Sequence, residues 1–501
     1  MYASCMDSNS IPLSLDQEQA FKTVSMILER AGINFTTGKI SNQIAENKTV
    51  HALIGRAGSG KTALLSSITE KMLKVGVEII SGDFEVNKNK NKRTLSVLAP
   101  TNKAANILRM RGVPATTIHR ILYTPVYDPD YEKIVEWLIG ERDEKPSIEG
   151  ISEISLKRAW EFYSSNKSIP GALAAAGLKG SDFISGWKRR EEPLDIGFID
   201  ESSMLDDDQL NDLKEIFSTL ILFGDPAQLA PISQSRQMVF DKFSPDKKSI
   251  LSQIHRQKSD NPILKLSNVL LDPEINFTDF EMLIKKISTE DDRIVWAQRV
   301  DVDLMSRSPV LVWRNATRIR LINAFRAVYN APNDRLLEGE PLICDGLELP
   351  LKHRKKRIDL EARGLTKGAN VIYLGPGKKT GFSRLFVVGS ESPRLSAASI
   401  IKIELPNEGQ PFIPFAAKMG AIFLHGSAVT IHKAQGSQWE NVQVFAPDIY
   451  AAAQTNRVES DLPLWKRLAY VAITRAQEKL YWVIRSRLSK PKVSLSTSDL
   501  K

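Results

Sequence analysis

Cysteine is scarce in this sequence. Only Cys5 and Cys344 occur among 501 residues, and they form no C-x-x-C pattern. A disulfide framework and a thiolate zinc site are thereby excluded, and a reducing compartment is the natural location. The six histidines are scattered along the chain without the spacing of metal ligands. The sequence therefore predicts no zinc centre.

Long apolar runs are also lacking. No stretch approaches the roughly 18 residues of a membrane-spanning helix. Residues 1–10 show no basic region followed by an apolar core, as a signal peptide would. We therefore expect a cytoplasmic protein without a membrane partner.

The composition that remains is globular, with 42% hydrophobic and 25% charged residues. It excludes a wholly disordered or collagen-like chain. The length predicts about three domains of roughly 150 residues each. Basic residues exceed acidic ones and give a formal net charge of +9, which fits a polyanionic partner.

The segment Gly55–Thr62 reads GRAGSGKT and matches the phosphate-loop pattern G-x-x-x-x-G-K-[ST] in full. An apolar strand pattern, Val50–Ile54, precedes it, and a helical pattern that runs to Val75 follows it. Such a loop turns its backbone amides towards a phosphate at the start of a helix. We expect nucleotide phosphates and Mg²⁺ at Gly55, Gly58, Ser59, Gly60, Lys61 and Thr62, with Lys61 on the β- and γ-phosphates and Thr62 on the metal.

Two adjacent carboxylates, Asp200 and Glu201, follow a second apolar strand pattern that ends at Ile199. At the carboxyl edge of a parallel sheet, Asp200 can hold Mg²⁺ through water and Glu201 can polarise the attacking water. The alternative is an acidic turn before a helix capped by Ser202 and Ser203.

A third strand pattern, Thr219–Phe223, leads into Gly-Asp-Pro. Asp225 and Gln228 follow directly, where a γ-phosphate sensor would be useful. An ordinary Gly-Asp-Pro turn is the alternative interpretation.

The order of the short motifs resembles a superfamily 1 helicase, specifically the RecD-like and Dda-like branch called superfamily 1B. The resemblance covers nearly the whole chain. Besides the phosphate loop, the segments that carry it are Leu15–Ala20, Ala99–Ala105, Thr116–His119, Asp200–Met204, Gly224–Ile232, Ile254–Gln257, Val429–Ser437 and Tyr470–Ala476.

This resemblance implies an ATP-dependent DNA helicase that moves 5′→3′ along one strand, with ATP and Mg²⁺ as cofactors. It makes Gln19 the adenine reader and Arg256 and Arg475 the arginine fingers. The catalytic set it implies is Lys61, Asp200, Glu201, Gln228, Arg256 and Arg475. Further nucleotide contacts are Gly436 and Gln438, and the metal is held by Thr62 and Asp200.

The same resemblance implies contacts to the nucleic-acid backbone from both halves of the chain. These residues are Pro100, Thr101, Asn102, Thr117, His119, Asn315, Thr430, His432 and Lys433. Phosphate contacts give affinity without reading sequence, which a translocating enzyme needs. For His119 and His432 a structural role remains an equal alternative.

Two departures from the family pattern concern residues in these sets. Asn102 stands where the family commonly has glycine, and Gln438 stands where an acidic residue often follows. Glutamine can still form a hydrogen bond with a ribose hydroxyl, but it lacks the charge, so nucleotide preference would be relaxed.

The fold class that follows is α/β, with two RecA-like P-loop lobes, a small insertion in the first lobe and an SH3-like β insertion in the second. We expect residues 1–120 and 195–260 to form the ATP-binding lobe, and residues 121–194 an aromatic-rich insertion that carries a strand-separating pin. Residues 261–340 and 426–501 would form the second lobe, and residues 341–425 the SH3-like insertion.

The expected partners are single-stranded and tailed duplex DNA, together with a single-strand-binding protein or replisome components, and the expected state is a monomer. The compact form resembles phage-encoded members of the branch. Three alternatives stay open. They are an RNA helicase of the same branch, a P-loop kinase, and a nucleotide-gated scaffold that binds nucleic acid without moving along it.

Overall fold

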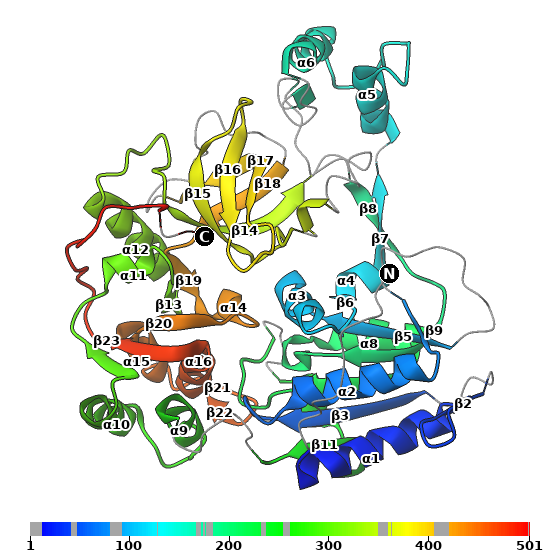
Figure 1. The fold of residues 1–501 in the computed structure, drawn as a ribbon, viewed down its shortest axis with the longest axis vertical. Coiled ribbons are helices and arrows are strands. Elements are labelled where there is room, and N and C mark those ends of the chain that lie inside the picture. Colours follow the sequence, from blue (N-terminus) through cyan, green and yellow to red (C-terminus); the bar gives the residue numbers. More distant parts are fainter. Residues whose placement is uncertain are drawn as a thin grey trace.

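The computed structural model describes residues 13–41, 48–80, 93–127, 129–166, 172–173, 176, 184–231, 237–253, 261–348, 359–361, 363–404, 420–498 and 500 (Figure 1). Two α/β lobes lie side by side, a β-barrel lies above the space between them, and a small helical unit extends from the first lobe. Within this described part, no helix is long and apolar enough to cross a membrane.

The first lobe is built on a seven-stranded sheet in which every pairing is parallel, in the order β11-β3-β10-β9-β5-β4, with β6 paired to β5. The strands are β3 (Thr49–Gly55), β4 (Glu78–Ile79), β5 (Thr94–Ala99), β6 (Ala115–Thr117), β9 (Leu194–Ile199), β10 (Phe217–Gly224) and β11 (Lys248–Leu251). The helices around it are α1 (Leu15–Arg30), α2 (Lys61–Lys74), α3 (Asn102–Met110), α4 (Ile118–Leu122) and α8 (Asp207–Ile216). A short hairpin of β1 (Ile33–Asn34) and β2 (Lys39–Ile40) follows α1.

The near-continuous apolar runs of these strands have a simple cause. Helices cover both faces of the sheet, so both sets of side chains are buried, as in β9, where all six residues are buried. Because the strands are parallel, the loops after β3, β5, β9 and β10 all leave from one edge. This edge collects the motifs predicted to bind nucleotide and nucleic acid.

The second lobe repeats this arrangement on a five-stranded parallel sheet in the order β12-β23-β20-β13-β19. The strands are β12 (Ile294–Ala297), β13 (Val310–Val312), β19 (Ala428–Thr430), β20 (Trp439–Phe445) and β23 (Ala476–Val483). Its helices are α9 (Pro262–Val269), α10 (Phe277–Glu290), α11 (Val302–Met305), α12 (Asn315–Val328), α14 (Ile431–Ala434), α15 (Ala446–Ala453) and α16 (Leu464–Ile473). A hairpin of β21 (Val458–Glu459) and β22 (Leu462–Pro463) precedes α16.

A closed five-stranded barrel interrupts the second lobe. It comprises β14 (Pro341–Glu348), β15 (Asn370–Pro376), β16 (Phe382–Val387), β17 (Arg394–Lys402) and β18 (Gly420–His425). Buried Glu340, at its junction with the lobe, accepts a hydrogen bond from His425 Nε2 at 2.9 Å and lies 3.2 Å from Arg326 Nε of α12. This pairing fixes the barrel to the lobe, and the predicted class of two RecA-like lobes with a β insertion is confirmed.

The insertion in the first lobe stands on an antiparallel ribbon of β7 (Tyr123–Tyr127) and β8 (Ile184–Arg189). It carries α5 (Pro129–Ile139) and α6 (Glu153–Asn166), which Figure 1 shows at the top of the molecule, away from both sheets. Several of its aromatic residues surround a small core, and the rings of Trp137 and Trp160 lie 5.0 Å apart. Phe183 lies outside the described residues, as does the basic run 353–357.

Candidate functional site

The phosphate loop joins β3 to α2 through glycines in conformations that other residues avoid. Gly58 and Gly60 have φ values of +85° and +81°, and Gly60 caps the N-terminus of α2. A Cβ atom on Gly55 would collide with the Ser59 hydroxyl, which is buried in the loop. The loop therefore presents backbone amides and the positive end of a 14-residue helix, a combination that binds phosphate.

Lys61 lies inside this loop. Its ammonium donates hydrogen bonds to the carbonyls of Gly55 and Arg56 and is 4.0 Å from Asp225 Oδ2, at the end of β10. The charge of Lys61 also lowers the pKa of Asp200, although burial and the neighbouring Glu201 outweigh it. A single cation is thus shared by the loops that follow β3, β9 and β10.

The glutamine that contacts the phosphate loop is Gln17, which differs from the predicted Gln19. Gln17 is buried, and its Nε2 donates to the carbonyl of Ser59 at 3.1 Å, whereas Gln19 is exposed. The cause is the register of α1, because Ser14 and Gln17 form a capping box that turns Gln17 inward. The capping pattern Ser-x-x-Gln was visible in the sequence and could have indicated that Gln17 turns inward.

Asp200 and Glu201 lie side by side after β9. Burial and the adjacent Glu201 raise the pKa of Asp200 to about 7. Glu201 adopts the left-handed backbone conformation, with φ of +53°, which is strained for a side chain of this size. Gln228 Nε2 donates to Glu201 Oε2 at 2.9 Å, and Ser203 donates to Gln228 Oε1 at 3.2 Å, so the Glu201 carboxylate is held by a defined chain of hydrogen bonds.

The oxygen donors available for a metal are the buried Asp200 carboxylate and the hydroxyl of Thr62, in the first turn of α2. In the described part of the chain, no group of three His, Cys, Asp or Glu side chains could hold a metal ion. This donor set fits Mg²⁺, which binds through one or two carboxylates, substrate phosphates and several waters. A divalent cation would also relieve the repulsion that raises the pKa of Asp200.

Helix α16 of the second lobe reaches across to this site. The buried Tyr470 hydroxyl donates to Asp225 Oδ2 at 3.0 Å and accepts a hydrogen bond from the Ala57 amide of the phosphate loop at 2.9 Å. One turn earlier, the fully buried Arg467 donates to the carbonyls of Pro226 and Gln228. The second lobe therefore forms hydrogen bonds with both the phosphate loop and the loop after β10.

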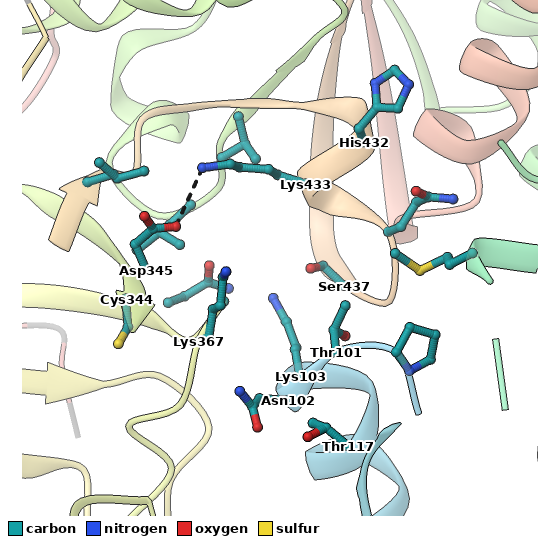
Figure 2. Close-up of a pocket in the computed structure, with 18 of the residues that line it drawn as sticks. Thr101, Asn102, Lys103, Thr117, Cys344, Asp345, Lys367, His432, Lys433 and Ser437 are labelled. Atoms are coloured by element: carbon teal, nitrogen blue, oxygen red, sulfur yellow. Dashed lines mark ion pairs between the residues drawn. The ribbon is translucent and has the colours of Figure 1, made fainter. Parts of the chain in front are cut away.

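A cavity of about 620 Å³ opens between the two lobes and the barrel (Figure 2). Seven of the predicted nucleic-acid contacts line it: Pro100, Thr101, Asn102, Thr117, His119, His432 and Lys433. Cations also come from each wall, namely Lys103, Arg120, Arg318, Lys367 and Lys433, and Asp345 is the one acidic residue among the described lining. The cavity is thus shaped and charged for a polyanion.

The barrel is tied to both lobes across this cavity. Lys433 of α14 lies 3.5 Å from Asp345 of β14, the ion pair drawn in Figure 2. Arg120 of α4 in the first lobe donates to Glu361 at 2.5 Å. Movement between the lobes therefore changes the width of the cavity or breaks these contacts.

Threonines at the carboxyl ends of three strands cap the helices that follow. Thr101 accepts from the amide of residue 104 at 3.1 Å, and Thr117 and Thr430 make the equivalent contact at 3.4 Å. Each hydroxyl group can accept this bond and still donate its own proton. Thr430 and Asn315 lie at the carboxyl edge of the second sheet, next to the cavity and not in its lining, and Asn315 Oδ1 accepts from Arg318 Nε at 2.8 Å.

Lys103 lines the cavity and also contacts the opposite lobe. Its ammonium lies 4.9 Å from the centre of the Trp439 ring of β20, a cation–π contact between the lobes. Burial, and after it the charge of Arg475, lowers the pKa of Lys103 to about 7. Arg475 itself is buried and donates hydrogen bonds to the carbonyls of Val471 and Ser437. Because Ser437 lines the cavity, the guanidinium of Arg475 lies behind that part of the cavity wall.

Comparison with known proteins gives two domain matches. Residues 39–276 match the family described as "AAA domain", and residues 425–483 match "UvrD-like helicase C-terminal domain". The two matches fall on the two lobes, in the order that the motifs predicted. The chain therefore carries an AAA domain followed by a helicase-type C-terminal domain, the arrangement that the resemblance to superfamily 1B helicases implied. It is accordingly an ATP-dependent helicase.

Solved helicase structures also match this chain, at low identity. Pif1 helicase from Candida albicans is 15% identical over 94% of this chain and 95% of its own, with a TM-score of 0.46. Bacteroides Pif1, crystallised with ssDNA, is 14% identical over 94% and 92%, also with a TM-score of 0.46. No curated protein matches the sequence.

The remaining residues of the predicted nucleotide site are Arg256, Gly436 and Gln438. Arg256 falls within residues 254–260, outside the described part. Gly436, with φ of +69°, lies against Thr101 and Ala104 of the first lobe, so it belongs to the lobe contact beneath the cavity. Gln438 Oε1 accepts a hydrogen bond from Gln477 at 3.2 Å.

Several residues of the site escaped sequence reasoning. Lys103 and Tyr470 stood inside recognised motifs, so position alone could have indicated them. Trp439 and Arg467 gave no such signal, because their roles depend on which surfaces the two lobes bring together.

We expect Tyr470→Phe to lower the free energy of unfolding by about 1–3 kcal/mol, because the Ala57 amide and the Asp225 carboxylate would each lose a buried partner. Denaturant unfolding measures this change. Tyr481→Phe, on β23 of the same lobe, is the control and should change stability by less than about 0.5 kcal/mol. Equal effects of the two variants would contradict the bridging role of Tyr470.

Proposed function

We propose that this helicase moves along single-stranded DNA in the 5′→3′ direction and separates tailed duplex DNA as it hydrolyses ATP. The observation that carries the proposal is that both sites are built from both lobes. Helix α16 contacts the phosphate loop, and the cavity takes its lining from α3, α14 and the barrel. ATP binding that changes the distance between the lobes therefore also changes how tightly the cavity holds the nucleic-acid strand.

The roles at the nucleotide follow from charge and hydrogen bonding. Lys61 would neutralise the β- and γ-phosphates, and Asp200 and Thr62 would hold Mg²⁺, which supplies charge stabilisation when bound. Glu201, held by Gln228, would orient the attacking water. Arg256 and Arg475 would act as fingers from the two lobes, and Gln17 takes the place first given to Gln19 near the base.

At the strand, we assign phosphate contacts to Thr101, Thr117 and Thr430, with Asn102, Asn315 and Lys433 beside them. Partial burial lowers the pKa of His119, and burial lowers the pKa of His432, so both rings are neutral at pH 7 and can donate a hydrogen bond without adding charge. These groups recognise backbone more than base edges, as a sequence-independent motor requires.

We further propose the division of the chain that the sequence suggested, with the first lobe at 1–120 and 195–260 and its insertion between them. The second lobe takes 261–340 and 426–501, and the barrel takes 341–425. In support, the ribbon, the second sheet and the barrel draw their strands from within these ranges, and so does the first sheet except that β9 begins one residue earlier, at Leu194.

Glu201→Gln should slow ATP hydrolysis by about 100-fold to 1,000-fold while ATP affinity changes little, because the amide cannot accept a proton from water. Steady-state turnover and nucleotide titration separate the two effects. Glu215→Gln, an exposed change on α8, serves as control. Loss of ATP binding by the Glu201 variant would show a structural role instead.

Affinity for single-stranded DNA should fall as pH rises from 6 to 8, because Lys103, with a pKa of about 7, is protonated only below that pH. A single coupled proton changes affinity by up to about tenfold per pH unit. Lys103→Arg keeps the charge at every pH and should flatten the curve, whereas Lys367→Arg should leave it unchanged. An unaltered slope in the Lys103 variant would exclude Lys103 as the titrating group.

Direction is tested with duplexes that carry either a 5′ or a 3′ single-stranded tail. We expect ATP-driven separation of the 5′-tailed DNA alone. Separation of only the 3′-tailed DNA would keep the motor and contradict the polarity. Activity confined to tailed RNA would favour the RNA helicase, and ATP turnover without separation of any duplex would favour the scaffold.

A further inference from the structure

A second cavity, of about 510 Å³, lies on the second lobe away from the cleft between the lobes. Four arginines line it, Arg314, Arg320, Arg485 and Arg487, and the described lining contains no acidic side chain. The remaining lining residues are Phe445, Pro447, Ile484 and Ser486. All four arginines are exposed, so their charges face the solvent that fills the cavity.

The topology of the sheet explains why these arginines gather. Strands β13, β20 and β23 are parallel, and Phe445 pairs with Val483 at their common carboxyl edge. The chain leaving each strand supplies part of the lining. Helices α12 and α15 also begin at this edge, above and below the sheet in Figure 1, so two helix N-termini add positive potential.

One of the four arginines is held rigidly. Buried Asp448 of α15 accepts hydrogen bonds from the amides of Trp313 and Arg314, at 3.0 and 2.9 Å, and from Arg314 Nε at 2.9 Å. This carboxylate offsets one charge and fixes the turn between β13 and α12. The pocket still carries a net positive charge, which comes from Arg320, Arg485 and Arg487.

Helix α12 contributes to the lining of both the pocket and the nucleic-acid cavity. Thr430, at the end of β19, pairs in register with Val312 of β13, so the two strands end level with each other. Asn315 stands next to Arg314, and Arg318, one turn further along α12, already lines the first cavity. A strand that passes Thr430 and Asn315 along this edge meets the arginines next.

We propose that the four-arginine pocket binds backbone phosphates of the single strand where it continues beyond the first cavity, and so lengthens the binding site. Guanidinium groups suit this task because their paired N–H donors match phosphate oxygens. Continuity with the first cavity along α12 favours a nucleic-acid strand over an acidic protein segment as the occupant. This inference rests on the proposed binding of single-stranded DNA by the first cavity.

The test compares the double variant Arg485→Gln/Arg487→Gln with the control Lys285→Gln/Lys286→Gln, which removes two exposed charges from α10 of the same lobe. Affinity for fluorescent oligo-dT of about 6 and about 16 nucleotides, a range typical of single-strand sites, is measured at several salt concentrations. Thermal unfolding of both variants confirms that each is folded.

We expect the pocket variant to lose roughly tenfold in affinity for the longer strand and little for the shorter one. Its salt slope on the longer strand should fall by about 1.4, since each lost phosphate contact on single strands accounts for about 0.7. The control variant should match the wild type at both lengths.

Two results would overturn the inference. Behaviour equal to the control at both lengths would remove the pocket from the strand path and make an acidic protein segment the better occupant. An equal loss at both lengths would mean that the pocket does not extend the site. Failure of the wild type to bind either strand would instead refute the proposed function, and the inference with it.

Discussion

Helix α16 is hydrogen-bonded to the loops of the opposite lobe, and the arrangement of both functional sites depends on that contact. Tyr470 joins the Ala57 amide to the Asp225 carboxylate, and Arg467 binds the carbonyls that follow Asp225. These groups are buried, so separating the lobes would expose or orphan them. The loop after β10 is consequently shared between the lobes, and it also holds Gln228 against Glu201. One loop is therefore part of both the predicted nucleotide site and the contact between the lobes.

The barrel connects this contact between the lobes to the predicted nucleic-acid cavity. It is anchored to the second lobe through Glu340 and paired with the first lobe through Arg120 and Glu361. It closes the cavity on the side that the two sheets leave open, and it adds Asp345 opposite Lys433. Lys103 lies beneath, between Trp439 and the charge of Arg475. Packing and hydrogen bonds therefore connect the phosphate loop, the contact between the lobes and the cavity wall near Lys103.

Much of the fold and site followed from local pattern. The loop from Gly55 to Thr62 has the strand and helix on either side that its sequence required, since glycine geometry and apolar runs are local properties. Gln17, and not the predicted adenine reader Gln19, contacts the phosphate loop, because the direction of a side chain on α1 depends on the capping of its first turn. Gly436 was predicted to contact the nucleotide, and the structure places it against Thr101 and Ala104 of the other lobe.

The sequence by itself determined the family, the two-lobed α/β class and the chemistry of the phosphate loop. Each of these is encoded in short segments whose residues act through their own backbone and near neighbours. Only the tertiary structure decided that Gln17 contacts Ser59, that Lys103 faces Trp439, and that arginines from separate strands share one pocket. Those contacts join residues far apart in the chain, and their existence depends on how sheets, helices and barrel pack together. The periodicity of hydrophobic residues along the sequence does not indicate how these elements pack.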